Sequence, residues 1–241
     1  MTTLQIAETV VGKIVAKHPK VARVFEKHQI DYCCRGGTTL AEACQLQGAD
    51  LEVVAAEIEQ VRDGDVSTDE TNWNEAPLAE LADHIVDTHH AFLNTELPRI
   101  SGLTEKVFNA HGAKRPELGK VKETFKLMRE ELESHMAKEE RILFPAIRTL
   151  ELQGGPQAFP FGSVANPIGM MEHEHDDAGN ALRRLRELTE DYTPPQDACP
   201  TYRVMLESLE NLELDLHLHI HKENNILFPR AQELERSGNS V

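Results

Sequence analysis

One string of residues occurs twice in this chain of 241 residues and restricts its fold more than any other feature. The string is His-x-x-x-Glu-x-x-Ile-Leu-Phe-Pro, and its two copies begin at His135 and His219. A separation of four residues places the His and the Glu of each copy on one face of an α-helix, about one turn apart. The repeat therefore predicts a pseudo-two-fold pair of helices, each presenting an imidazole and a carboxylate to the same place. We expect the Ile-Leu-Phe-Pro segments to pack in a core and to end their helices.

Amphipathic periodicity predicts four long helices, separated by segments rich in Gly and Pro such as Pro194-Pro195. They cover about 77–100, 117–149, 166–191 and 198–235. Aromatic residues make up only 5% of the chain, and runs of β-branched residues are scarce, which argues against a β-sandwich or barrel. The expected fold is therefore all-α, with a four-helix bundle.

The predicted bundle is preceded by a smaller region of different composition. Residues 1–62 read as short helices and form a small helical N-terminal domain that carries Cys33 and Cys34. Thr38 or Thr39 is a suitable N-cap for one of these helices. Residues 63–76 are polar and aperiodic and read as a linker, so the bundle is expected to cover residues 77–236.

Histidines on the apolar faces of the predicted helices are candidate metal ligands. His135 and His219 lie on apolar stripes of the second and fourth helices, and His175 lies on that of the third. On the first helix, periodicity leaves His84 and His89 equally suitable. A lone inward His is usually a hydrogen-bonded core residue, but three of them buried with two carboxylates require a compensating cation. The metal-facing set is therefore His135, Glu139, His175, His219 and Glu223, with one further His from the first helix.

Mixed imidazole and carboxylate ligands suit iron, manganese or zinc.

Two competing interpretations of the histidines are less well supported. His217 and His221 also form an i, i+4 pair that is compatible with zinc, but they lie on a polar stripe and are expected in solvent. A ferritin-like di-iron site needs two Glu-x-x-His motifs, and only Glu172 with His175 provides one.

Charge and cysteine content exclude several classes of protein. The chain has 25 Lys and Arg against 41 Asp and Glu, a formal net charge of −16, which disfavours binding to nucleic acids or anionic membranes. No run of about 18 apolar residues predicts a membrane-spanning helix, and the N-terminus lacks the pattern of a secretory signal. The four cysteines contain no CxxC motif and read as reduced thiols, so a cytoplasmic protein is expected.

With these motifs, residues 78–235 resemble a hemerythrin-like bundle. Residues 1 to about 60, with Asp31-Tyr32-Cys33-Cys34-x-Gly-Gly, resemble the small domain that precedes it in the repair-of-iron-centres family of iron–sulfur cluster repair proteins. This resemblance implies two iron ions, bridged by carboxylates and an oxo group. On the first helix it selects His84. The ligand set that it implies is His84, His135, Glu139, His175, His219 and Glu223.

The resemblance also implies a function. It predicts repair of iron–sulfur clusters damaged by nitrosative or oxidative stress, by iron donation rather than by enzymatic turnover. Expected partners are damaged or apo iron–sulfur proteins, with nitric oxide or oxygen as small ligands, and the chain is expected to be a monomer or homodimer. Nitric oxide reduction and nitric oxide or oxygen sensing at the same centre are the alternatives.

The adjacent cysteines are the remaining candidates for chemistry. Cys33 and Cys34 are expected to accept iron, nitric oxide or a thiol of a partner, and their adjacency would also permit a strained disulfide. The other interpretation is that one of them is a small buried apolar residue beside a glycine turn. Cys44 and Cys199 are expected to be structural.

Overall fold

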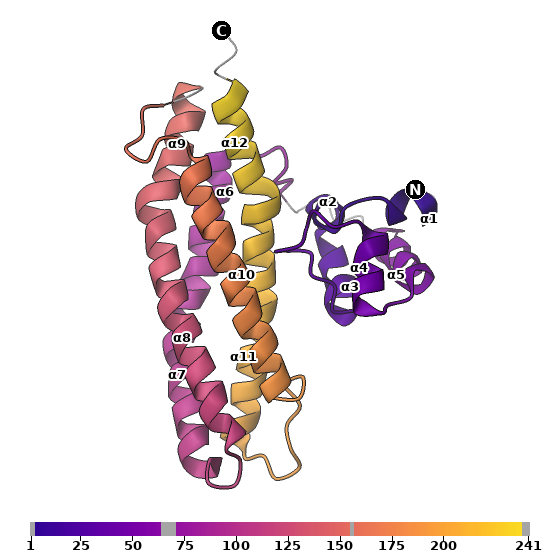
Figure 1. Ribbon diagram of the computed structural model, residues 1–241, viewed down its shortest axis with the longest axis vertical. Helices are drawn as coiled ribbons and strands as arrows, with labels where there is room; N and C mark the ends of the chain where they lie inside the picture. Colours follow the sequence, from indigo (N-terminus) through magenta and orange to yellow (C-terminus); the bar gives the residue numbers. More distant parts are fainter. Residues whose placement is uncertain (1–2, 64–70, 155–156, 238–241) are drawn as a thin grey trace. The chain divides into compact units, whose positions relative to one another are not determined.

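The computed structural model of the chain describes residues 3–63, 71–154 and 157–237 (Figure 1). Regular secondary structure in these ranges is helical, and β-pairing within them is confined to two isolated bridges. The prediction of an all-α fold, with a helical bundle preceded by a small helical region, is confirmed. None of the described helices is long and apolar enough to cross a membrane.

The N-terminal region consists of six short helices around one apolar cluster. Phe25, Leu40 and Ile58 are fully buried in this cluster, and Ile220 from the C-terminal part of the chain joins it. Thr39, not Thr38, caps the helix that follows the cysteines, in a capping box with Glu42. The helices are α1 (Thr3–Ala7), α2 (Val11–Lys17), η1 (Pro19–Val21), α3 (Ala22–Lys27), α4 (Leu40–Gln47) and α5 (Leu51–Asp63).

The rest of the chain forms the long helices of the bundle (Figure 1). Three of them are continuous through a short π-helical segment, named η2, η3 or η4. In chain order the elements are α6 (Leu78–His84), η2 (Ile85–His90) and α7 (Ala91–His111); α8 (Glu117–Lys138), η3 (Glu139–Leu143) and α9 (Phe144–Gln153); α10 (Ala165–Leu188); and α11 (Pro200–Lys222), η4 (Glu223–Leu227) and α12 (Phe228–Ser237).

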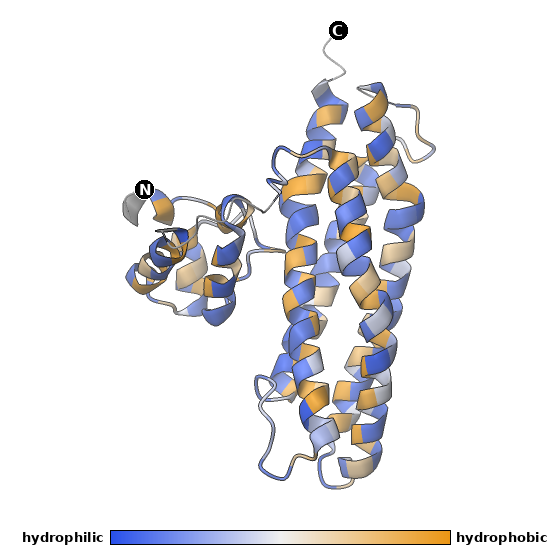
Figure 2. Cartoon of the chain, turned by 180° about the vertical axis from the view of Figure 1, so that it is seen from behind, coloured by the Kyte–Doolittle hydropathy of each residue, from blue (hydrophilic) through white to orange (hydrophobic). Residues whose placement is uncertain are grey.

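The apolar faces of these helices build the second core. Leu97 of α7, Phe125 of α8, Leu182 of α10 and Leu209 of α11 belong to one buried cluster. Figure 2 shows apolar and polar residues interspersed along the long helices, as expected of amphipathic helices. The first long helix runs to His111, beyond the predicted end near residue 100, because buried residues continue along the same face.

The described residues divide into two compact units. The first comprises Met1–Ala82, Arg148–Ala158 and His217–Val241, and the second comprises Asp83–Ile147 and Phe159–Leu216. The boundary falls inside α6, α9 and α11, each of which is a continuous helix. Part of the predicted linker, residues 64–70, lies outside the described residues. Next to it, Arg230 donates hydrogen bonds to the carbonyls of Trp73 and Ala76.

The expectation that each Ile-Leu-Phe-Pro segment ends its helix is wrong. The chain continues as α9 and α12 after Pro145 and Pro229. A proline in a helix lacks the N–H donor and its ring pushes against the carbonyl one turn earlier. In both copies the wider turn of a π segment, η3 or η4, immediately precedes the Phe-Pro pair. This widening gives the proline ring room within an otherwise continuous helix.

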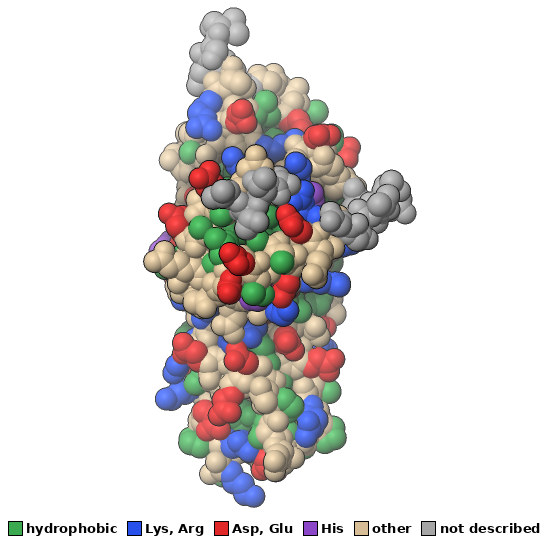
Figure 3. All heavy atoms as spheres, turned by 90° about the vertical axis from the view of Figure 1, so that its right-hand side faces the viewer, with side chains coloured by type: hydrophobic (Ala, Val, Ile, Leu, Met, Phe, Trp, Pro, Cys, Tyr) green, Lys and Arg blue, Asp and Glu red, His purple; other side chains and the backbone are tan. Residues whose placement is uncertain are grey.

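Charged side chains of both signs lie on the face of the molecule that Figure 3 presents. Figure 3 shows acidic and basic side chains interspersed on the face that it presents. On this face, Lys and Arg side chains lie between the acidic ones. They do not form an extended basic patch there.

Candidate metal centre

Six buried side chains gather in two groups of possible metal ligands. Within each group, one ligand atom from every residue lies within 4.8 Å of the others. All six residues are at most 3% exposed. The first group is His90, Glu139, His219 and Glu223, and the second is His135, Glu139, His175 and Glu223.

Glu139 and Glu223 belong to both groups. They are the equivalent glutamates of the two copies of the repeat, and each is the first residue of a π segment. Neither has any exposed surface. These two carboxylates are therefore the residues that the two ligand groups have in common.

Short distances join each glutamate to the imidazoles of its group. His135 Nε2 and His90 Nε2 each lie 3.3 Å from Glu139 Oε2. In the second copy, His219 Nε2 lies 3.1 Å from Glu223 Oε1. The Nε2 atoms are thus the ones that face the carboxylates, and they are the nitrogens available to bind a shared ion.

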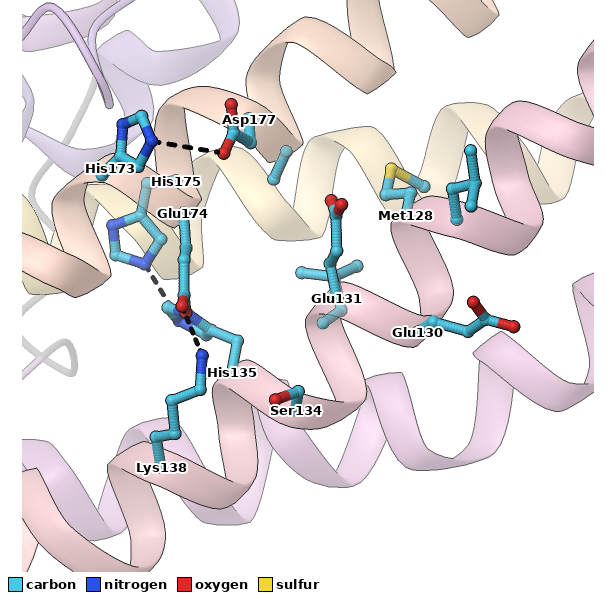
Figure 4. A pocket seen from close by; sticks show the side chains of 13 residues that line it. Met128, Glu130, Glu131, Ser134, His135, Lys138, His173, Glu174, His175 and Asp177 are labelled. Carbon is cyan, nitrogen blue, oxygen red and sulfur yellow. Dashed lines mark hydrogen bonds and ion pairs between the residues drawn. The ribbon is translucent and has the colours of Figure 1, made fainter.

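The opposite nitrogens of two of these histidines contact carboxylates outside the groups. His90 Nδ1 lies 2.8 Å from Glu140 Oε1, and His135 Nδ1 lies 2.9 Å from Glu174 Oε2. A carboxylate at Nδ1 favours a proton there and leaves Nε2 as the ligand, which is the usual support of metal-binding histidines. Glu174 also contacts Lys138 (Figure 4). Burial opposes ionisation of Glu174, but its hydrogen bonds to Lys138 and His135 outweigh this and lower its pKa.

The chemistry of the donor set fits bound metal. Each group contains two imidazoles and two carboxylates. Two buried carboxylates this close repel one another, and removing their charge from water costs several kcal/mol unless a cation or a proton compensates. Ligation by nitrogen and oxygen suits iron, manganese or zinc. We conclude that the buried groups are able to hold metal.

A pocket of about 440 Å³ opens beside the second group. In Figure 4 His135 and His175 point toward one another from two helices, and their Nε2 atoms are 3.1 Å apart. Carboxylates are prominent among the residues that line this pocket, so it is an acidic route that reaches two of the candidate ligands. The acidic residues of its lining are Glu130, Glu131, Glu174 and Asp177.

Comparison with known proteins then places the chain. The family model of the hemerythrin HHE cation binding domain matches residues 81–231, and that of a domain of unknown function, DUF542, matches residues 7–62. The chain is 40% identical over 222 residues to the iron-sulfur cluster repair protein YtfE of Escherichia coli O157:H7, which covers 91% of this chain and 94% of that protein. The YtfE proteins of E. coli O17:K52:H18 and Shigella boydii serotype 18 are 39% identical over the same shares. The chain belongs to the repair-of-iron-centres family.

Five of the six ligands expected from the repair-of-iron-centres family lie in the two groups, namely His135, Glu139, His175, His219 and Glu223. The first helix differs, because the structure brings in His90 rather than His84. His84 is half-buried, with Nδ1 3.3 Å from Thr88 Oγ1. His89, the other candidate from periodicity, is buried with Nδ1 2.9 Å from Asp215 Oδ1.

The π segment η2 explains why the position of His90 is missed. Its residues, Ile85–His90, follow a wider turn than the 3.6-residue period assumed in assigning faces. A signal was nevertheless present in the sequence, because His90 shares a helical stripe with the apolar residues Val86 and Leu93. Burial of the ring, at 1% exposure, agrees with that stripe.

The expectation that His221 lies in solvent is wrong. His221 is 4% exposed, and its ring packs edge-on against Tyr32 with centroids 5.6 Å apart. Asn225 Nδ2 lies 3.2 Å from its Nδ1. Burial lowers the pKa of His221 to about 4, so the ring is neutral at pH 7. His217 is half-buried and also lies near the ring of Tyr32.

None of the four cysteines is a member of either His and Glu group. Cys33 is buried and Cys34 half-buried, and their sulfurs are 3.8 Å apart as thiols. Cys44 is buried in the N-terminal core. Cys199 lies 3.2 Å from His111 Nε2.

Proposed function

We propose that this chain is a di-iron protein of the cytoplasm that repairs iron–sulfur clusters damaged by nitrosative or oxidative stress, by donating iron to damaged or apo iron–sulfur proteins. The observation that carries the proposal is the membership of Glu139 and Glu223 in both buried ligand groups. The relatives that match nearly the whole chain are named as iron–sulfur cluster repair proteins, which supports the same role.

The proposed ligands divide into one terminal pair of histidines for each ion. His90 and His219 would hold one ion, and His135 and His175 would hold the other. Glu139 and Glu223 would bridge the two. His90 replaces His84 in this assignment because His90 is a member of a ligand group and its Nε2 atom lies 3.3 Å from Glu139 Oε2.

In this proposal, acidic residues around the centre orient its histidines and attract cations. Glu140 and Glu174 hold protons on the Nδ1 atoms of His90 and His135, so that each Nε2 is available as a ligand. Iron bound here would supply open coordination positions for small ligands. Nitrogen and oxygen ligands hold ferrous iron less tightly than thiolates do, which suits a centre that gives iron up. The acidic pocket beside His135 offers a path along which a departing cation is attracted.

Metal content of the purified protein tests the centre. We expect about two irons per chain in the unmodified protein, and partial or full loss after Glu139→Leu or Glu223→Leu, because either change removes a ligand of both ions. Glu123→Leu is the matched control, since Glu123 is exposed on the same helix as His135. Equal iron content in all four proteins would refute the assignment.

Iron donation is tested by mixing the iron-loaded protein with an apo iron–sulfur protein and following cluster formation. We expect the loaded protein to lose iron as clusters form. Steady reduction of nitric oxide with an electron donor and no iron loss would instead establish the enzymatic alternative. Reversible binding of nitric oxide or oxygen without either outcome would establish the sensor.

A further inference from the structure

The loop between α3 and α4 brings two thiols and a carboxylate together outside the His and Glu groups. Asp31, Cys33 and Cys34 each offer a ligand atom, and these three atoms lie within 4.8 Å of one another. Cys33 Sγ is 3.8 Å from Cys34 Sγ and 3.4 Å from Asp31 Oδ1. This is a second type of ligand set, with soft sulfur donors in place of imidazoles.

The spacing of these atoms matches the edges of a tetrahedral metal site. Two thiolates bound to one ion by bonds of about 2.3 Å lie about 3.8 Å apart, and a carboxylate oxygen bound at about 2.0 Å lies about 3.5 Å from each sulfur. The sulfur–sulfur distance of 3.8 Å and the sulfur–oxygen distance of 3.4 Å agree with both values. A disulfide needs a sulfur–sulfur distance of about 2.05 Å, so Cys33 and Cys34 are not joined by one. Their distance is instead the one expected of two thiolates bound to the same ion.

Backbone hydrogen bonds fix the carboxylate of this set. Asp31 Oδ1 accepts from the N–H of Cys34 at 2.9 Å and from that of Arg35 at 3.2 Å. These bonds close a turn that directs both sulfurs to the same side, although the side chains of adjacent residues in an extended strand point apart. A carboxylate oriented by such donors loses little freedom when it binds an ion.

A helix of the C-terminal part of the chain holds the other side of the loop. Asn225 Nδ2 in η4 donates to the carbonyl of Tyr32 at 3.2 Å and to that of Cys33 at 3.1 Å. Gly36 lies so close to Asn225 that a side chain there would clash with its amide. These contacts of Asn225 with the backbone hold the loop in one conformation.

Access to solvent differs among the three residues. Cys33 is 4% exposed, whereas Cys34 and Asp31 are partly exposed. An ion can thus enter past Cys34 and Asp31, and three ligands leave one tetrahedral position for an exchanging group. The same spacing also suits hydrogen bonds between neutral thiols. The hydrogen bond with Cys34 and burial raise the pKa of Cys33, so an ion must displace protons to bind.

We propose that Asp31, Cys33 and Cys34 form a site for one thiophilic divalent cation, of the class of Zn²⁺, Co²⁺ or Fe²⁺, with one coordination position open. Binding forms two metal–thiolate bonds and one metal–carboxylate bond, and the two thiol protons pass to solvent. No electron is transferred. The site shares no residue with the two His and Glu groups, so it stands or falls separately from the proposed di-iron centre.

Titration of the reduced, metal-free full-length protein with Co²⁺ tests the site. Thiolate-to-cobalt charge transfer gives a near-ultraviolet band that imidazole and carboxylate ligands do not produce. We expect the band to reach the intensity of about one thiolate-bound Co²⁺ per chain, whatever Co²⁺ the His and Glu groups also take up. About two more protons should be released than in Cys34→Ser, because two thiols are deprotonated. Cys34→Ser should abolish the band, and Asp31→Asn should weaken Co²⁺ binding about tenfold or more. Cys199→Ser is the matched control and should leave the band unchanged.

Three results would overturn the site. They are the absence of the band in the unmodified protein, its persistence in Cys34→Ser, and unchanged affinity in Asp31→Asn. Circular dichroism checks that each variant is folded, and both substitutions are at partly exposed positions. Iron content of the same preparations, loaded separately, reports on the His and Glu groups, so failure of one site is distinguished from failure of the other.

Discussion

At the scale of single residues, the repeated string allowed two of the most buried charged groups to be predicted. Glu139 and Glu223 could be found because each has a His four residues earlier and because the two copies confirm one another as a pattern. His90 has no such partner in the sequence. Its inward position depends on a π segment. The wider turn of such a segment cannot be predicted from the spacing of apolar residues, which assumes 3.6 residues per turn.

The pair His90 and His84 gives a direct test of the ligand assignment. His90→Ala should lower iron content from about two per chain to about one or less, because an ion would lose one of its two imidazoles. His84→Ala, six residues earlier on the same continuous helix, should retain both irons. Metal analysis of the two variants with matched helicity measures the effect. Retention of iron by His90→Ala together with its loss in His84→Ala would reverse the assignment.

At the scale of elements, the helices were predictable and their continuity was not. Apolar residues at helical spacing marked the four long segments, since burial of one face dominates helix stability in proteins. The prolines of the repeat were expected to end their helices, but the helices continue past them after the π segments η3 and η4. The hydrogen bonds of Asn225 to the cysteine loop were also unpredictable, because they join residues almost 200 positions apart with no local signal.

Two adjacent glycines in the cysteine loop test the contact with η4. Gly36→Ala should lower the free energy of unfolding by about 1–3 kcal/mol, because the new methyl group would displace Asn225 from the carbonyls that it holds. Gly37→Ala should change it by less than about 0.5 kcal/mol, because no atom lies within 4 Å of the added carbon. Denaturant unfolding measures both. Equal effects would show that the contact with Asn225 contributes nothing to stability.

At the scale of the whole molecule, composition already indicated an acidic helical protein with separate N-terminal and bundle regions. The family models match in the same order along the chain, first residues 7–62 and then residues 81–231. Composition could not predict that four long helices bring a set of buried carboxylates and imidazoles together. Burying such a set lowers the stability of the folded state unless a cation is bound, so cation binding and folding are linked here.

Removal of iron should therefore lower the thermal stability of the protein. A ligand present at about 100 times its dissociation constant stabilises the folded state by about 2.7 kcal/mol, which corresponds to about 5–10 °C in a domain of this size. Thermal unfolding before and after chelation measures the change. In Glu223→Leu the midpoint should respond less to chelation, in proportion to the iron that this variant has lost. Identical midpoints for loaded and stripped unmodified protein would contradict the linkage.

The five residues of η4 have a consequence for how two ion sites would communicate. Glu223 and Asn225 are two positions apart in one turn, so a carboxylate of the bundle groups and the amide that clamps the cysteine loop share a single piece of backbone. A displacement of that turn alters both at once. If an ion at one end displaced the turn, it would change the affinity at the other end, and reciprocity would make the factor the same in both directions. Loading and unloading would be parts of one cycle rather than independent events.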